Sequence, residues 1–237
     1  MNLNYIEVDI EKSNTMQQFS QFYNEILNLS LDENQIETFS QLSDTLAKKK
    51  GNFFGKNSYN ILLIQNQDST TVGGIIYDYF FDSNVGLIEY IVTDPKFKKQ
   101  GIATYAYNTA CSLLNIESKK NGFDRINFVC CEVEKINSSK CENHYFWENF
   151  GFKKLNFDYI QPSLDEGKEI VRDMDFGIIT QTPNIPFEQS FIKKDILKSI
   201  LHDYAYYTMR INKPEEEPFF IEMCNGLENQ EEEIELK

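Results

Sequence analysis

Histidine, cysteine and long apolar runs are scarce in this sequence of 237 residues, which has 2 His and 5 Cys. No CxxC pair or zinc-type ligand spacing occurs, so we expect no metal site. The odd cysteine count favours a reducing compartment over a disulfide framework. No stretch reaches the roughly 18 apolar residues of a membrane helix, and the N-terminus MNLNYIEVDIEKS lacks the apolar core of a signal peptide. We therefore expect a cytoplasmic protein without a membrane segment.

Basic residues are also in the minority. The chain has 23 Lys and Arg against 37 Asp and Glu, a formal charge of -14. This balance argues against general affinity for nucleic acid or for an anionic membrane, because both are bound through clustered Lys and Arg. Nine glutamates lie between residues 214 and 237, where we expect an acidic, solvated tail. The remaining negative charge slightly favours a cationic partner.

The composition is that of a folded protein. Hydrophobic residues make up 41% of the chain, with 19 Phe and 13 Tyr, enough apolar surface for a real core. The length fits one large domain, or one domain with an appendage. We place a soft boundary near residue 182, where TPNIP interrupts all periodicity. Residues 1–182 would form the main domain and 183–237 a helix and short strand packed on it.

Hydrophobic periodicity predicts a mixed fold. Strands are expected at 4–10, 59–66, 72–81, 85–94, 126–133, 154–161 and 169–180. Helices are expected at 14–29, 35–49, from Gly101 to about 120, from a cap at Ser138 or Ser139 to about 149, and at 195–211, while 218–224 reads as a short strand. The order predicts an α/β (α+β) fold with a mixed central sheet of about six to seven strands, flanked by helices.

The segment TDPKFKKQGIAT, residues 93–104, combines positive charge with the hand-over from a strand to a helix. The N-terminus of a helix has unpaired N–H groups and the positive end of the helix dipole, so it binds anions. Lys98 and Lys99 add charge, and Gly101 lets the backbone approach a ligand closely. A surface turn is the alternative. Some forty residues later comes a second signal, FWENFGF.

These two segments resemble the GCN5-related N-acetyltransferases (GNAT). The family's first motif reads hydrophobic-x-Pro-x-x-Arg/Gln-x-x-Gly-x-Gly/Ala, and this chain has Thr93, Pro95, Lys98, Gly101 and Ala103 at those places. The family's second landmark is commonly Phe-Tyr-x-x-x-Gly-Phe, and the matching residues here are Phe146, Gly151 and Phe152. The resemblance covers roughly residues 1–165. Two positions depart from it: Lys98 replaces Arg or Gln, and Trp147 stands where many relatives have a tyrosine that protonates the leaving thiolate.

The resemblance implies a GNAT-like fold that binds acetyl-CoA, or another acyl-CoA, as co-substrate. The diphosphate would lie on the helix N-terminus and the pantetheine beside the strand before it, with Phe146 nearby. The implied binding residues are Ile91, Val92, Thr93, Lys98, Lys99, Gln100, Gly101, Ile102, Ala103, Thr104 and Phe146. A backbone N–H near Val92 or Thr93 would stabilise the oxyanion of the tetrahedral intermediate.

Two carboxylates are candidates for the base that deprotonates the amine. Glu89 lies in the apolar run LIEYIV, where burial should raise its pKa, and strand alternation predicts that it points away from Tyr90. Glu132 ends the strand FVCCEV and resembles in position a glutamate that serves as base in some relatives. Tyr145, His144 or a water remain candidates for the acid. Cys130 and Cys131 read as buried, inert residues.

The expected function is therefore an acyl-CoA-dependent N-acetyltransferase that acts on the primary amine of a small molecule or peptide, by direct attack in a ternary complex. The alternative is an inactive GNAT-fold module that binds acyl-CoA or a protein, which Trp147 motivates. Tyr204, Tyr206 and Tyr207 are expected in the core, although their helix could instead cover the acceptor site or form a homodimer surface.

Overall fold

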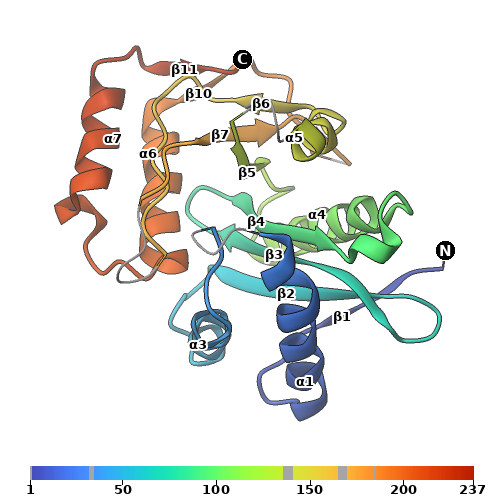
Figure 1. Cartoon of the computed structure of the whole chain (residues 1–237). Coiled ribbons are helices and arrows are strands. Elements are labelled where there is room, and N and C mark those ends of the chain that lie inside the picture. Colours follow the sequence, from blue (N-terminus) through green and yellow to red (C-terminus); the bar gives the residue numbers. More distant parts are fainter. Residues whose placement is uncertain (1, 32–34, 136–140, 165–169, 184) are drawn as a thin grey trace.

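The computed structural model describes residues 2–31, 35–135, 141–164, 170–183 and 185–237, and the side chains of these residues except at 141–144 and 186. A seven-stranded sheet forms its centre, with strand order β1-β2-β3-β4-β5-β7-β6 (Figure 1). Its strands are β1 Asn4–Glu7, β2 Ser58–Gln65, β3 Thr71–Phe80, β4 Val85–Thr93, β5 Phe128–Glu134, β6 Phe152–Lys154 and β7 Met174–Ile179. Neighbours are antiparallel except β4 and β5, which are parallel.

Helices and short strands surround this sheet. The helices are α1 Ser13–Phe22, α2 Asn28–Ser30, α3 Phe39–Lys50, α4 Ile102–Lys120, α5 Cys141–Glu148, α6 Lys194–Asp203 and α7 Pro218–Glu228. Single turns are η1 Tyr23–Leu27 and η3 Tyr204–Thr208 (π) and η2 Pro95–Phe97 and η4 Pro214–Glu216 (3-10). Two small pairs are β8 Gln181–Thr182 with β9 Ile185–Pro186, and β10 Phe191–Lys193 with β11 Glu233–Glu235.

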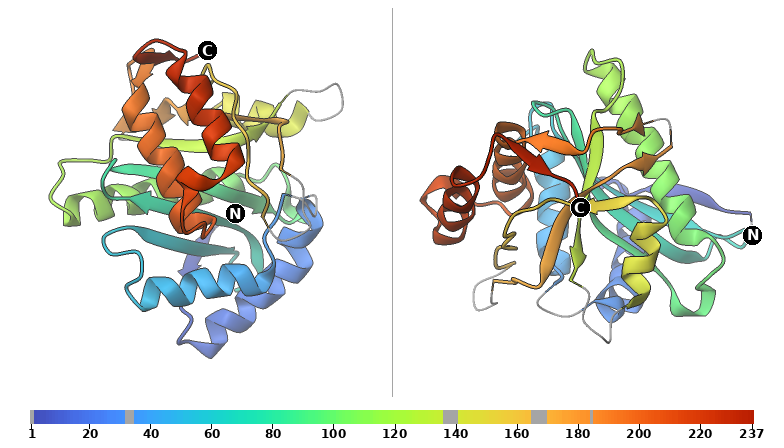
Figure 2. Two further views of the ribbon diagram at one scale, coloured as in Figure 1. Left: turned by 90° about the vertical axis from the view of Figure 1, so that its left-hand side faces the viewer. Right: turned by 90° about the horizontal axis from the view of Figure 1, so that it is seen from above.

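Alternate residues of β3 divide the core between the two faces of the sheet. Ile75 and Tyr77 pack beneath α4 and Trp147 of α5. On the opposite face, Ile76 packs with α1 and α3, and Phe80 packs with α6 and α7. The C-terminal helices lie side by side over the part of the sheet formed by β5 and β7 (Figure 2). Residues from 183 onward therefore share their core with the central sheet.

Three expected elements are wrong. The strand expected at 154–161 ends at Lys154 in β6, after which Leu155 and Gln161 make only isolated bridges. The short strand expected at 218–224 is helix α7, because its apolar residues recur at helical spacing and bury one helical face. The acidic segment is folded rather than a solvated tail: Leu227 and Ile234 are buried, while the glutamates lie on the surface.

The other elements agree with the predicted pattern to within a few residues. The helix expected at 195–211 is α6 followed by the π turn η3, and the expected caps Ser138 and Ser139 lie outside the described residues. Tyr204 is buried and Tyr206 and Tyr207 are partly buried, and Cys130 and Cys131 are fully buried. The sequence did not indicate that β7 inserts between β5 and β6, since strand order depends on long-range pairing.

Candidate active site

The parallel strands β4 and β5 separate halfway along their length. Their pairing runs from Val85 and Phe128 to Ile88 and Cys131. Beyond this point β4 continues to Thr93 with β3 as its partner, and β5 continues with β7. After the separation, the two strand edges that face each other have no strand partner among the described residues.

The backbone register identifies which groups of β4 face that open edge. The Asp94 N–H donates to the Val72 carbonyl over 2.9 Å, so residue 94 faces β3. In an antiparallel pair every second residue bonds to the partner strand. Val92 therefore faces β3 as well, whereas the N–H groups of Ile91 and Thr93 point away from β3. Of the two expected oxyanion donors, Thr93 therefore has an N–H that points to the open edge, whereas the N–H of Val92 faces β3.

The N-terminus of α4 lies directly after β4 and is exposed. Gly101 is its N-cap, with φ of 79°, and no side chain among the described residues caps this helix end. A Cβ atom on Gly101 would meet no atom within 4 Å. Lys98, Lys99, Gln100 and Thr104 are all exposed. No described side chain therefore hydrogen-bonds to the first-turn amides, and the turn suits an anion such as a diphosphate.

Gly73 in β3 allows this helix end to pack tightly on the sheet. A Cβ atom there would lie 2.6 Å from the Val92 carbonyl oxygen and 2.9 Å from Cγ2 of Ile102, the first residue of α4. Two polar side-chain atoms of β4 and α4, Oγ1 of Thr93 and Oδ1 of Asn108, are buried without a hydrogen-bond partner among the described residues. They are suitable partners for the polar groups of a bound molecule.

Glu89 is the extra residue of a β-bulge in β4. Ile76 pairs with Tyr90 and Tyr77 pairs with Ile88, so Glu89 has no residue opposite it on β3. A bulge breaks the alternation of side chains. As a result Glu89 and Tyr90 lie on the same face, covered by the N-terminal and C-terminal helices. The prediction that Glu89 points away from Tyr90 is wrong, because alternation does not hold across the bulge.

Glu89 forms a buried carboxyl pair with Asp78 of β3. Both Glu89 oxygens are buried, and no N–H or O–H group of the described residues donates to them. Burial, and then the neighbouring Asp78, raise the pKa of Glu89 well above its ordinary value. Burial also raises the pKa of Asp78 to about 6, against the opposing hydrogen bonds from Glu89 and from the Thr208 hydroxyl. Two adjacent carboxyl groups hold a single proton more readily than none.

Glu132 lies on the same face, just beyond the point where β5 leaves β4. It accepts hydrogen bonds from the hydroxyls of Tyr159 and Tyr204, the latter over 3.2 Å, and from Nε2 of Gln161 over 3.0 Å. Burial raises the pKa of Glu132 to about 7, and these three donors limit the rise. Glu132 thus accepts three hydrogen bonds, whereas Glu89 accepts none from an N–H or O–H group of the described residues.

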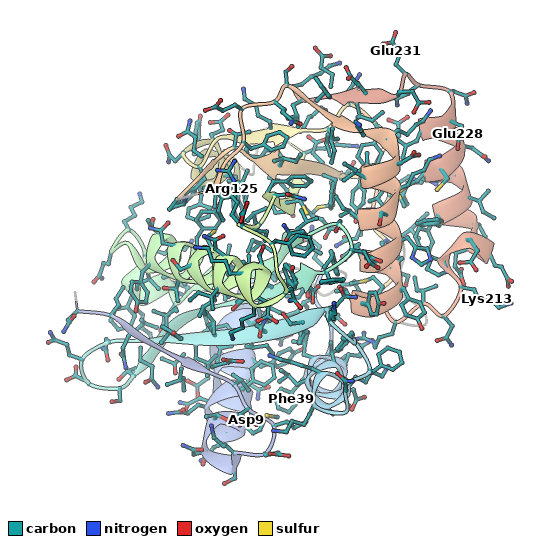
Figure 3. The ribbon with its side chains drawn as sticks, turned by 180° about the vertical axis from the view of Figure 1, so that it is seen from behind. Asp9, Phe39, Arg125, Lys213, Glu228 and Glu231 are labelled. Atoms are coloured by element: carbon teal, nitrogen blue, oxygen red, sulfur yellow. The ribbon has the colours of Figure 1, made fainter. Side chains whose placement is uncertain are left out.

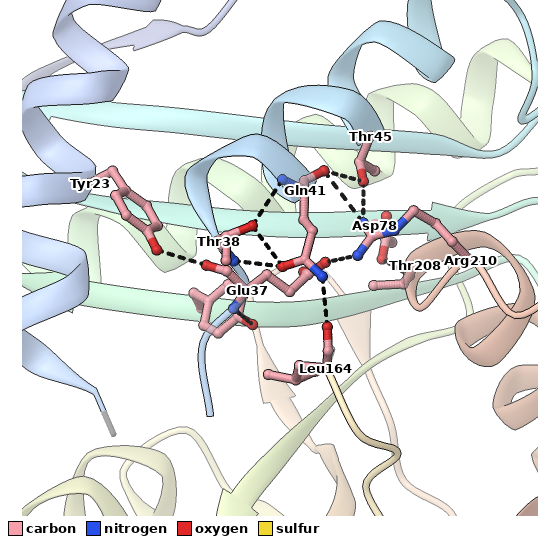
Figure 4. A network of polar contacts seen from close by, with 10 residues as sticks. Tyr23, Glu37, Thr38, Gln41, Thr45, Asp78, Leu164, Thr208 and Arg210 are labelled. Atoms are coloured by element: carbon pink, nitrogen blue, oxygen red, sulfur yellow. Dashed lines mark hydrogen bonds and ion pairs between the residues drawn. The ribbon is translucent and has the colours of Figure 1, made fainter. Parts of the chain in front are cut away.

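A buried ion pair on the same face of the sheet joins the C-terminal segment to the segment before α3. The guanidinium of Arg210, which follows η3, donates to the carboxylate of Glu37 and to Oγ1 of Thr45 in α3, the latter over 2.6 Å (Figure 4). The Glu37 backbone is held by Tyr23, whose hydroxyl donates to the Glu37 carbonyl over 3.0 Å. The C-terminal segment thereby supplies Tyr204, Thr208 and Arg210 to acidic groups of the main domain.

Tyr145, the candidate acid on α5, does not lie beside the carboxyl groups of Glu89 and Asp78. Tyr145 is 63% exposed, whereas Trp147 is buried, with its ring edge-on to Tyr107 at 6.1 Å. Phe146 is partly buried and packs against Trp147 and Phe150. The side chain of His144 lies outside the described residues.

Sequence reasoning missed Asp78, Thr208 and Arg210. Asp78 had a signal, a lone charge in the apolar run VGGIIYDYFF. Thr208 and Arg210 had none, because their partners lie more than 100 residues away.

Comparison with known proteins agrees with this geometry. The sequence model described as Acetyltransferase (GNAT) family matches residues 23–152. Because the match spans more than half of the 237 residues, the chain belongs to this family. No curated protein matches the chain. The predicted family and the predicted mixed-sheet fold class are thus confirmed.

Solved structures share the fold. A protein from Bacteroides thetaiotaomicron, described as a GNAT-family acetyltransferase, has 16% identity and a TM-score of 0.61, with 90% of this chain and 100% of that chain covered. Ard1 from Thermoplasma volcanium has 14% identity and a TM-score of 0.50, with 75% of this chain and 96% of that chain covered. At such identities the likeness concerns the fold alone.

None of the helices in the described part of the chain is long and apolar enough to cross a membrane. Likewise, its described His, Cys, Asp and Glu side chains include no group of three or more that could hold a metal ion.

Proposed function

We propose that this protein is an acyl-CoA-dependent N-acyltransferase that transfers an acetyl group from acetyl-CoA to a primary amine. The observation that carries the proposal is the exposed, uncapped N-terminus of α4 at Gly101, next to the open edge of β4. Membership of the GNAT family supports the same reaction class. Residues 183–237 are then a C-terminal extension of the same domain, since they share its core.

Acetyl-CoA would be held at two places. The first-turn amides of α4, with Lys98 and Lys99 beside them, would bind the diphosphate by charge-assisted hydrogen bonds. The Ile91 and Thr93 backbone groups that point away from β3 would pair with the amide groups of the pantetheine, as an added strand does. The thioester would thus lie beside the bulge. Phe146 is available to pack against the bound molecule.

Acyl transfer requires a neutral amine, a donor to the oxyanion and a proton for the departing sulfur. We assign the oxyanion donor to the N–H of Ile91 or Thr93, which have no partner in β3. Glu89 takes the proton of the amine through a bridging water, because its own oxygens are buried. Neither Trp147 nor the exposed Tyr145 is placed to protonate the sulfur, so we assign that step to solvent water.

Two measurements test the proposal. Acetyl-CoA at 100 times its Kd should raise the free energy of unfolding by about 2.7 kcal/mol, seen as a higher Tm. A panel of amines with acetyl-CoA should release free CoA thiol, and Glu89→Gln should abolish this release. No protection by acetyl-CoA would overturn the proposal. Binding without turnover on any amine would instead favour the inactive binding module.

A further inference from the structure

The carboxyl pair formed by Asp78 and Glu89 raises a problem for the proposed base. Two carboxyl groups can hydrogen-bond to each other only if one of them holds a proton. Glu89 receives no hydrogen bond from an N–H or O–H group of the described residues, so no such hydrogen bond favours its ionised form. A carboxyl group that already holds a proton can accept another only by giving its own away.

Asp78 is the better site for the negative charge of the pair. The Thr208 hydroxyl donates to Oδ2 of Asp78, and a hydrogen bond to a carboxylate favours its ionised form. The pKa directions agree, since the pKa of Asp78 is raised to about 6 and that of Glu89 is raised well above its ordinary value. At neutral pH the shared proton therefore lies on Glu89.

Other charged and titratable groups face this pair from every surrounding element. They lie before α3, on α3, on β2, on β4, in η3 and after η3, and they are Glu37, Lys49, Tyr59, Tyr90, Tyr204 and Arg210. Lys49 favours the ionised form of Asp78, Arg210 favours that of Glu89, and Glu37 opposes both. Glu37 is itself paired with Arg210. The surroundings therefore do not reverse the order set by Thr208.

We propose that Asp78 is the final acceptor of the amine's proton, that Glu89 relays this proton, and that Thr208 of the C-terminal extension holds Asp78 in its accepting form. The inference rests on the proposed function and deepens it. Asp78 acts through Glu89 and does not touch the substrate, so it is a positioning residue. The C-terminal extension is then part of the acid–base machinery and not merely a cover.

The relay balances in atoms and charge. As the amine nitrogen bonds to the acyl carbon, its N–H bond breaks and the proton, carried by the bridging water, binds the free oxygen of Glu89. The original O–H bond of Glu89 breaks at the same time, and that proton binds Asp78. Glu89 stays neutral, Asp78 becomes neutral, and the negative charge now lies on the carbonyl oxygen of the tetrahedral intermediate. When this oxygen re-forms its double bond to carbon, the C–S bond breaks and the sulfur takes a proton from water. Asp78 returns its proton to solvent by the reverse path.

Kinetics with matched variants test the relay. Asp78→Asn should lower kcat about 100-fold, the lower end of general-base effects, with little change in KM and with acetyl-CoA protection retained. Thr208→Val removes the hydroxyl at nearly constant shape and should shift the acidic limb of the pH–rate profile to higher pH. Thr208→Ser keeps a hydroxyl group and should return the acidic limb of the pH–rate profile to about pH 6. A wild-type kcat in Asp78→Asn, or an unmoved limb in Thr208→Val, would overturn the relay alone.

A second measurement needs neither a variant nor a substrate. Carbon NMR of the labelled carboxyl groups should find Glu89 protonated at neutral pH and Asp78 titrating at about pH 6. An ionised Glu89 at pH 7 would overturn the relay even if the variants fail to fold. If acetyl-CoA binds but no amine is acetylated, the relay falls together with the proposed function.

Discussion

Arg210 and Glu37 form a buried ion pair although 173 residues separate them in the sequence. Glu37 comes directly before the capped start of α3, and Arg210 comes shortly after the turn η3 that follows α6. The side chain of Glu37 is only 1% exposed. The pair therefore fixes the C-terminal extension to the face of the sheet that carries Glu89.

Breaking this pair should be costly. Arg210→Leu leaves the buried Glu37 carboxylate without its guanidinium, and such changes cost about 3–5 kcal/mol. Arg172→Leu is the matched control, because Arg172 pairs with Glu222 at 2.7 Å on the surface, where ion pairs contribute at most about 1 kcal/mol. Urea unfolding of both variants measures the difference. Equal losses would show that the buried pair does not anchor the extension.

The α4 amides can be tested by removing one N–H group. Ala103→Pro takes away a first-turn donor that has no partner within the helix, so the fold should tolerate it. Loss of one charge-assisted hydrogen bond should weaken acetyl-CoA binding about 10- to 100-fold. Asn14→Pro makes the same change at the same position of α1 and should leave binding unchanged. Isothermal titration calorimetry compares the acetyl-CoA affinities of the two variants. Equal affinities would contradict binding of the diphosphate at the N-terminus of α4.

The contact between α4 and β3 predicts a strong effect at Gly73. Gly73→Ala would place a Cβ atom 2.6 Å from the Val92 carbonyl oxygen and 2.9 Å from Ile102, so the helix end must move. We expect a loss of about 1–3 kcal/mol together with weaker acetyl-CoA binding. Gly226→Ala in α7 meets nothing within 4 Å and should stabilise by up to about 1 kcal/mol. Thermal unfolding with and without acetyl-CoA checks both.

Glu132 should make stability depend on pH. Burial raises its pKa from 4.5 to about 7, so between these values the folded state keeps a proton that the unfolded state has lost. This contribution to stability is present at low pH and is lost as pH rises through about 7, at about 1.4 kcal/mol per pH unit and up to about 3 kcal/mol in all. Glu132→Gln should reduce the difference in unfolding free energy between pH 5 and pH 8 by the contribution of Glu132, while the other buried carboxyl groups keep theirs.

The control for this experiment is Glu231→Gln, which makes the same change in net charge at an exposed position (Figure 3). Its pH dependence should follow that of the wild type. A Glu132→Gln variant with the wild-type difference between the two pH values would contradict the assignment of this pH dependence to Glu132.

Part of the candidate site could be predicted from local sequence. Pro95, the lysine pair and Gly101 between an apolar run and a helical pattern indicated the helix start at which we propose that an anion binds, because helix starts depend on nearby residues. Glu89 was noticed as a charge in an apolar strand. Its orientation was predicted wrongly, since a bulge depends on how two strands pair. The helix at 218–228 was missed because a short apolar run fits a strand equally well.

The sequence by itself determined the family, the mixed sheet and the turn at α4, since these follow from local periodicity and from motifs within a few residues. Only the tertiary structure decided which groups surround Glu89. Asp78 reaches it across neighbouring strands, and Thr208 and Arg210 arrive from the far end of the chain. Contacts between such distant positions follow from how the whole core packs, and no local pattern encodes them.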